Sequence, residues 1–180
     1  MIHILILIVL GLVTYLFHNY QEFSLGYIRP WAVQQVNFNR EANPQALCDL
    51  LAPDATVIIK DQYTRYRYEF TGGKAQACEY FIESASHFHK PQPKKNGYIP
   101  DRFTEFKVDR EDSLEGWFKD YADISFTEDI SYYSYGLVTV KNNETLIGKS
   151  HTKITVKSPI FKEKTITHYE FQRKLVQYSP

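Results

Sequence analysis

The 180-residue chain has no net charge, because its 21 basic side chains are balanced by 21 acidic ones. This absence removes the bulk electrostatic attraction on which general nucleic-acid binders depend, so we expect no nucleic-acid partner. Cysteine is also scarce, at two residues. Hydrophobic residues make up 43% of the chain, which suits one domain of ordinary size plus a terminal appendage. The 14 tyrosines and 12 phenylalanines are typical of a sheet with aromatic faces or of a pocket lined by rings.

The first segment of the chain lacks charged side chains. Met1–Phe17 is apolar apart from a few uncharged polar residues, and it is about the shortest run that spans a bilayer. We predict a transmembrane or signal-anchor helix over residues 1–23 and a connecting helix over residues 24–42. A cleaved signal peptide is the alternative, because Ser24-Leu25-Gly26 fits a small-x-small pattern, but no Lys or Arg precedes the apolar run. A buried core helix is the third interpretation.

Residues 43–88 carry the clearest periodic patterns. Asn43 is a suitable helix cap and Pro44 is a suitable first helical residue. The patterns predict a short helix, a hairpin and a second helix over Gln45–Ala52, Ala55–Lys60, Tyr63–Phe70 and Lys74–Phe88. Alternation places Tyr66, Tyr68 and Phe70 of the second strand on one face. The apolar stripe of the second helix is expected to lie on that face.

The two cysteines, Cys48 and Cys78, fall on the two helices of this unit. If the helices pack side by side in an oxidising compartment, a disulfide that closes about thirty residues contributes roughly 3 kcal/mol. The alternative, which we favour from the sequence, is a pair of reduced cysteines in the core, because small apolar residues on buried helical stripes are often unpaired cysteines.

Three long strand signals close the chain, over Asp129–Lys141, Glu144–Lys157 and Lys162–Gln177. Turn signals at Asn142-Asn143 and Ser158-Pro159 separate them, so we predict an antiparallel meander.

Alternation also assigns the side chains of the last two strands to faces. In one strand Thr152, Ile154 and Val156 are expected to lie opposite to His151, Lys153 and Lys157. In the other, Tyr169 and Phe171 are expected to lie opposite to Ile166, His168, Glu170 and Gln172. The two histidines therefore belong to the more polar faces, where a solvated sheet surface is favoured over a catalytic group.

Charge is unevenly distributed along the chain, although it sums to zero. Residues 101–129 carry ten acidic and four basic side chains, and residues 149–174 carry seven basic and two acidic ones. Such a charge separation could orient the domain on an anionic surface or drive head-to-tail association of two copies. Alternatively, neighbouring strands of opposite charge pair with each other across the sheet. We favour the cross-strand explanation.

The order of these elements resembles the nuclear-transport-factor-2-like fold, in which a curved sheet wraps around helices to form a cone-shaped pocket. Within it, Asn43–Phe81 resembles the steroid-isomerase and SnoaL-like polyketide-cyclase branch. The motifs that carry the resemblance are Asn43-Pro44-Gln45-Ala46-Leu47, Asp54-Ala55-Thr56-Val57 and Gly73-Lys74-Ala75-Gln76-Ala77-Cys78-Glu79-Tyr80. The resemblance implies an α+β domain over residues 43–180, with a cone-shaped curved antiparallel sheet wrapped on helices and preceded by one transmembrane helix.

The resemblance does not carry the isomerase chemistry over. It places the general-base aspartate of the isomerases on Ile59 and their oxyanion-donating tyrosine on Gln35. Proton abstraction next to a carbonyl needs a carboxylate and a donor, and neither position supplies one. Asp61 is the only nearby substitute, and we favour a hairpin-end aspartate that satisfies turn N–H groups. We lean towards no enzymatic activity and expect no cofactor and no metal.

Three functions stay open, and the first is a membrane-tethered interaction or assembly domain without chemistry. An apolar anchor followed by this fold also resembles the single-pass assembly factors of type IV secretion machines, whose domain lies in the periplasm. We accordingly expect a single-pass cell-membrane protein, bacterial in source, with its domain on the periplasmic or extracellular side. Its membrane contact is Met1–Phe17, and its partners are a second copy or other membrane proteins.

The second function is binding of a small hydrophobic molecule in the cone pocket. The aromatic residues expected to line that pocket are Tyr66, Tyr68, Phe70, Trp117, Tyr133, Tyr135, Tyr169 and Phe171. The third is an isomerase- or cyclase-like enzyme with a relocated acid and base. It requires two of Asp61, His151 and His168 to converge inside the cone.

Overall fold

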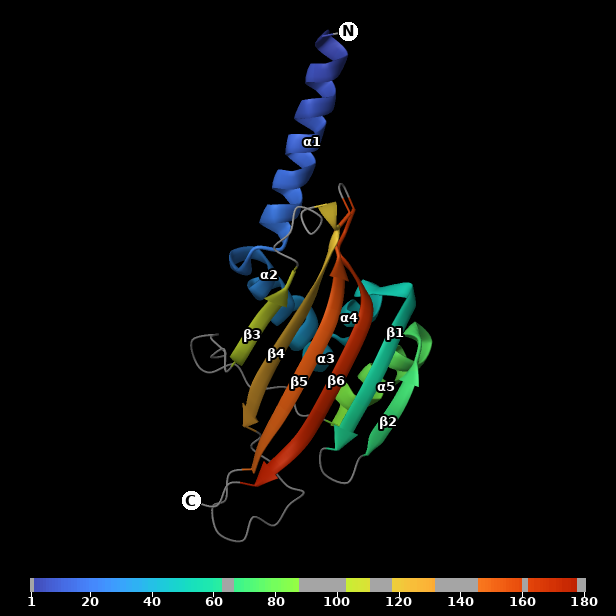
Figure 1. Cartoon of the computed structure of the whole chain (residues 1–180). Helices are drawn as coiled ribbons and strands as arrows, with labels where there is room; N and C mark the ends of the chain where they lie inside the picture. Colours follow the sequence, from blue (N-terminus) through green and yellow to red (C-terminus); the bar gives the residue numbers. More distant parts are fainter. Residues whose placement is uncertain are drawn as a thin grey trace.

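A computed structural model of the chain describes residues 2–62, 67–87, 103–110, 118–131, 146–159 and 162–177 (Figure 1). Its helices are α1 (Ile2–Glu22), α2 (Leu25–Trp31), the π-helical η1 (Ala32–Phe38), α3 (Asn39–Ala42), α4 (Pro44–Leu50) and α5 (Lys74–His87). Its strands are β1 (Leu51–Gln62), β2 (Tyr68–Gly72), β3 (Phe103–Asp109), β4 (Tyr121–Ser131), β5 (Leu146–Lys157) and β6 (Thr165–Gln177).

The strands form one sheet in the order β2-β1-β6-β5-β4-β3. All neighbours are antiparallel except β1 and β6, which pair in parallel, so the sheet is mixed. The predicted α+β fold class is confirmed, and so is the meander for the described parts of β4, β5 and β6. The helices from α2 to α5 lie on one side of the sheet, which we call the covered face, while α1 extends beyond the end of the sheet (Figure 1).

Alternation decides which side chains reach the covered face. Every second residue of β1, β4 and β5 is buried there, and α5 and the α2–α4 region supply the opposing apolar side chains. The fully buried residues include Val36, Leu47, Val57, Ile59, Ala77, Phe81, Ile124, Ile154 and Val156. The predicted stripe of α5 is therefore confirmed for Ala77 and Phe81.

The junction of α4 and β1 differs from the prediction. The side chain of Asn43 accepts a hydrogen bond from the Ala46 amide at 3.4 Å and Pro44 opens the helix, as expected. The helix ends at Leu50, and not at Ala52, because Leu51 is extended and pairs with Ile166 of β6. A tertiary strand pairing therefore overrides the local helical pattern.

The face of Ile166 was predicted wrongly. Ile166 and Tyr169 are both fully buried, although they were expected on opposite faces. The cause is a register irregularity: Val156 pairs with Ile166 and Thr155 pairs with His168, so Thr167 is an extra residue in β6. Such a bulge inverts the alternation on one side of it.

The acidic and basic segments meet across the sheet. The register of β4 and β5 places Asp129 opposite Lys149, and Nζ of Lys157 lies 3.7 Å from Oδ2 of Asp120. β4 begins at Tyr121, eight residues before the predicted strand, and the predicted turn at Asn142-Asn143 lies outside the described residues. The arrangement agrees with the cross-strand explanation of the charge dipole.

Candidate functional site

The first functional feature is the exposed apolar surface of α1. Ten aliphatic side chains between Ile2 and Val13 are 45–73% exposed, and Phe17 is 64% exposed. Among the described residues, α1 is the one helix long and apolar enough to cross a membrane. Its 21 residues correspond to about 31 Å of helix, of which the apolar residues 2–17 account for about 24 Å, close to the shortest length that spans a hydrocarbon core of about 30 Å.

Polar contacts attach the last turns of α1 to the end of the sheet. The hydroxyl of Tyr15 donates to the carbonyl of Phe118 at 2.7 Å, and Nη1 of Arg110 donates to the carbonyl of Asn19 at 2.8 Å. The ammonium of Lys164 pairs with the carboxylate of Glu22. Asn19 is fully buried at this junction. The contacts come from the end of β3, the start of β4 and the β5–β6 turn, so they fix α1 relative to the domain.

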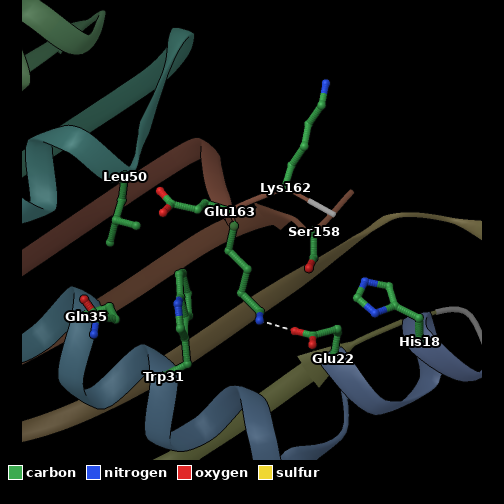
Figure 2. Close-up of a pocket in the computed structure, with 9 residues that line it drawn as sticks. His18, Glu22, Trp31, Gln35, Leu50, Ser158, Lys162 and Glu163 are labelled. Carbon is green, nitrogen blue, oxygen red and sulfur yellow. Dashed lines mark hydrogen bonds and ion pairs between the residues drawn. The ribbon is translucent and has the colours of Figure 1, made fainter. Parts of the chain in front are cut away.

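A cavity of about 370 Å³ lies at this junction (Figure 2). The cavity is lined by His18, Glu22, Trp31, Gln35, Leu50, Ser158, Lys162, Glu163 and Lys164. Its charged residues are two lysines and two glutamates, of which Lys164 and Glu22 form the ion pair already described. Trp31 and His18 lie on opposite sides of that pair, and Lys162 points away from it (Figure 2). Sequence reasoning did not identify this cavity, because its walls come from α1, the α2–η1 region, α4 and the β5–β6 turn.

The second feature is a row of polar residues across the covered face. The strand registers pair Asp61 of β1 with Arg173 of β6, Arg173 with Ser150 of β5, and Ser150 with Glu128 of β4. Asp61, Arg173 and Ser150 are at most 3% exposed. This row crosses four neighbouring strands and lies beside the apolar core.

Asp61 lies at the centre of a buried hydrogen-bonded group. Nε of Arg173 donates to Oδ1 of Asp61 at 2.9 Å, and Nη2 of Arg173 contacts Oδ2. The hydroxyl of Tyr80 in α5 donates to Oδ2 at 2.7 Å. Both carboxylate oxygens of Asp61 are therefore engaged by side chains of β6 and α5, whereas the turn that follows β1, to which the hairpin-end prediction refers, lies outside the described residues.

A second arginine enters this region from α3. Arg40 is 2% exposed, and its Nη2 lies 3.5 Å from Oε2 of Glu128. Its guanidinium carbon lies 4.2 Å from the centroid of the Phe171 ring, within the range of a cation–π contact. Sequence reasoning missed Arg40 and Arg173 because a buried arginine depends on partners distant in sequence.

Burial also changes two tyrosines next to this group. Burial raises the pKa of Tyr80, and the Arg173 guanidinium partly opposes that shift. Burial likewise raises the pKa of Tyr169, with Arg40 opposing it. Both phenols therefore stay protonated in the folded protein beyond the range usual for tyrosine.

The four described members of the predicted aromatic lining all pack against the core. Tyr169 and Phe171 are fully buried, and Tyr169 lies 5.3 Å from Phe81 between ring centroids. Tyr68 and Phe70 are half-buried and lie 5.4 Å and 6.1 Å from the Tyr80 ring. The remaining members, Tyr66, Trp117, Tyr133 and Tyr135, lie outside the described residues. The pocket lining stays a prediction.

The three acid/base candidates do not converge. Asp61 is on the covered face, whereas His151 is exposed on the opposite face, where its Nδ1 lies 3.2 Å from Oγ1 of Thr127. His168 pairs with Thr155 and is half-buried on that same outer face. The two positions matched to the isomerase groups do not form a site either, because Ile59 is fully buried in the core and Gln35 lines the cavity at α1.

Cys48 and Cys78 form a disulfide between α4 and α5, with their Cα atoms 5.4 Å apart. The two cysteines are therefore paired, and not reduced as the sequence pattern favoured. Within the described parts of the chain, no group of three or more His, Cys, Asp or Glu residues is arranged to hold a metal ion.

The chain matches no protein-family model, and it matches no curated protein. Its fold is similar to several solved structures. A ketosteroid isomerase-like protein from Erwinia carotovora atroseptica is 11% identical, with a TM-score of 0.47 over 87% of this chain and 97% of that chain. A chain of the yeast deubiquitinase and cofactor complex is 11% identical, with a TM-score of 0.49 over 87% and 99%. The beta subunit of benzoate 1,2-dioxygenase from Burkholderia mallei is 15% identical, with a TM-score of 0.45 over 84% and 91%. Similarity of this extent concerns the arrangement of the chain and not its chemistry.

Proposed function

We propose that this protein is a membrane-tethered domain that acts by binding other proteins and has no chemistry of its own. The observation that carries the proposal is α1, whose ten aliphatic side chains from Ile2 to Val13 are exposed beyond the domain. Transferring a large aliphatic side chain out of water is worth about 1.5–3 kcal/mol. Insertion of α1 into a bilayer would remove all ten aliphatic side chains from water together.

The attachment of α1 to the sheet supports a scaffolding role. Tyr15, Asn19 and Glu22 of α1 contact the domain directly. The last turns of the apolar helix are therefore held against the end of the sheet. A domain held in this way presents the same surfaces to neighbouring membrane proteins at all times. Partners of this kind are a second copy of the chain or a complex of membrane proteins.

The arrangement of the candidate acid/base groups supports a role without catalysis. An isomerase- or cyclase-like enzyme with a relocated acid and base would need two of these groups within reach of one substrate. His151 and His168 lie on the outer face, and Asp61 is engaged by Arg173 and Tyr80 on the covered face.

The disulfide between Cys48 and Cys78 supports a periplasmic or extracellular position of the domain. Disulfides persist in oxidising compartments and are rare in the cytosol. The proposal therefore places α1 in the cell membrane and the domain on its outer side.

The proposal is tested with the full chain expressed in a bacterium, followed by alkaline extraction of the membranes. We expect the wild type to stay in the membrane pellet and Leu7→Arg combined with Leu10→Arg to be released, because arginine is costly at the centre of a bilayer. The control is Lys149→Gln with Lys153→Gln, which changes charge on the exposed outer face of β5 without placing like charges opposite each other. Release of the wild type would refute the tether.

The binding role is tested by cross-linking in intact membranes. We expect the wild type to give cross-linked species larger than one chain, with membrane proteins or second copies identified by mass spectrometry. A chain that remains monomeric and uncross-linked in its own membrane would refute the interaction role and return attention to the cone pocket.

A further inference from the structure

The segment that leads into β4, residues 118–121, presents two exposed aromatic rings at the end of the sheet nearest to α1. Phe118 and Tyr121 are 44% and 41% exposed. β4 begins beside the lower part of α1, while the end of β6 lies at the opposite pole of the domain (Figure 1). The domain itself leaves these two large aromatic rings partly uncovered, although they lie close to the apolar helix α1.

The level of this segment relative to the bilayer follows from its contact with α1. The rings of Tyr15 and Phe118 are stacked, with centroids 6.5 Å apart, and the Tyr15 hydroxyl donates to the Phe118 carbonyl. Phe17 is the last large apolar side chain of α1 that is strongly exposed before the buried polar contact of Asn19 with Arg110. Because a charged guanidinium is costly inside a hydrocarbon core, a bilayer that holds α1 is expected to end between Phe17 and the Asn19–Arg110 contact.

Tyr15 lies two residues before Phe17, which is about 3 Å along a helix axis. With α1 in the bilayer, Phe118 is therefore expected near the depth of the membrane–water interface, because it contacts Tyr15. Aromatic side chains are enriched at that depth because the ring is apolar and its surroundings are partly hydrated.

The charges of the segment fit the same position. The ammonium of Lys119 lies 5.8 Å from the Tyr121 ring centroid. The carboxylate of Asp120 is compensated by Lys157, with 3.7 Å between Nζ and Oδ2. Its backbone carbonyl accepts from the Ser158 amide at 2.7 Å, which fixes the segment to the β5–β6 turn.

We propose that residues 118–121 rest on the bilayer as a second contact of the domain with the lipid surface. The partner is the headgroup region of the membrane, into which Phe118 and Tyr121 insert their rings. Together with α1, this contact fixes the orientation of the domain on the membrane and directs the far end of the sheet away from it. The inference rests on the proposed tether.

The test uses spin labels on single introduced cysteines in the full chain, with the Cys48–Cys78 disulfide intact. The chain is reconstituted into vesicles of phosphatidylcholine and phosphatidylglycerol. The three labelled variants are Leu7→Cys in α1, Lys119→Cys in the segment, and Lys149→Cys on the exposed outer face of β5. Lys149 is the matched control, because it is also a lysine and lies towards the other end of the sheet. Accessibility to oxygen and to a water-soluble nickel chelate gives the depth of each label.

We expect the Leu7 label to be accessible to oxygen and protected from nickel, and the Lys149 label to be fully accessible to nickel. The Lys119 label is expected at headgroup depth, with nickel accessibility several-fold below that of Lys149. A Lys119 label as accessible as Lys149, with Leu7 still protected, would overturn the second contact and leave the tether intact. A Leu7 label exposed to nickel would overturn the tether itself. Circular dichroism of each variant checks that it folds.

Discussion

Asp61 and Arg173 face each other across the parallel strands β1 and β6, with 2.9 Å between Oδ1 and Nε. Their side chains are 4% and 1% exposed. The two residues are 112 positions apart, so the pair joins the first strand of the domain to its last. Tyr80 of α5 donates to the same carboxylate. The group therefore connects the sheet, its parallel seam and the main covering helix at one point.

Removal of one member of this pair is expected to be strongly destabilising. Arg173→Met or Asp61→Asn leaves the other member buried without its partner, which typically costs about 3–5 kcal/mol. The double change Asp61→Leu with Arg173→Met is expected to recover part of that loss, because neither member of the pair stays buried without the other, although the Tyr80 hydroxyl loses its acceptor. The measurement is urea unfolding of the full chain in mild detergent.

The matched control for the buried pair is the exposed pair of Lys60 and Glu69, at 4.0 Å with 49% and 71% exposed side chains. Lys60→Gln is expected to change the free energy of unfolding by less than about 1 kcal/mol. Equal effects of Lys60→Gln and Arg173→Met would show that the buried pair is not what holds β1 to β6.

The buried tyrosines predict a loss of stability at high pH. The pKa values of Tyr80 and Tyr169 are raised in the folded state, so their contribution to stability is fully present below the ordinary tyrosine pKa of about 10. Above that pH the unfolded chain releases phenol protons that the folded chain retains. The free energy of unfolding then falls by up to about 1.4 kcal/mol per pH unit for each tyrosine.

The check is a series of urea titrations between neutral and strongly alkaline pH. Tyr80→Phe is expected to lose about 1–3 kcal/mol at neutral pH, because the hydrogen bond to Asp61 is removed. Its alkaline slope is expected to be shallower than that of the wild type. An identical slope in both proteins would contradict the role of burial at Tyr80.

The disulfide predicts a stability that depends on reducing agent. Cys48 and Cys78 enclose a loop of thirty residues, for which chain entropy gives about 3–4 kcal/mol. Labelling of the denatured chain with maleimide-PEG is expected only after reduction. The double change Cys48→Ala with Cys78→Ala is expected to unfold at lower urea, with no further effect of reductant. Two labelled thiols in the unreduced wild type would show that the cysteines are free in the cell.

Local periodicity was sufficient for the elements that depend on their own residues. The helical spacing from Lys74 predicted α5, and strict alternation predicted the buried faces of β5 at Thr152, Ile154 and Val156. Asn43 and Pro44 predicted the start of α4. In each case the side chains that decide the conformation are close neighbours in sequence, within one or two helical turns or a few strand residues.

Features that depend on distant pairing were not predictable from the sequence alone. The partner of Asp61 is set by the parallel register with β6, and nothing near Asp61 indicates Arg173. The bulge at Thr167 inverts the face of Ile166, and no glycine or other local signal marks it. The cavity at α1 is likewise formed by elements far apart in the chain. These are the positions at which tertiary contacts override or extend local preference.

The attachment of α1 predicts a specific effect of Arg110. Asn19 lies in the last turn of α1, where the final four carbonyls have no partner within the helix, and Arg110 donates to the Asn19 carbonyl. Its positive charge also suits the negative end of the helix dipole, and its guanidinium lies 5.3 Å from the Phe23 ring centroid. Arg110→Gln is therefore expected to release the end of α1.

Hydrogen exchange of the full chain in vesicles measures that release. We expect faster exchange over the end of α1 and over α2 in Arg110→Gln, while β5 and β6 keep their protection, because the sheet does not depend on this contact. Lys107→Gln is the control, since Lys107 is an exposed cation on the same strand region. Unchanged exchange in Arg110→Gln would mean that Tyr15 and Glu22 hold the helix without it, and faster exchange throughout the sheet would mean that α1 and the domain unfold as one unit.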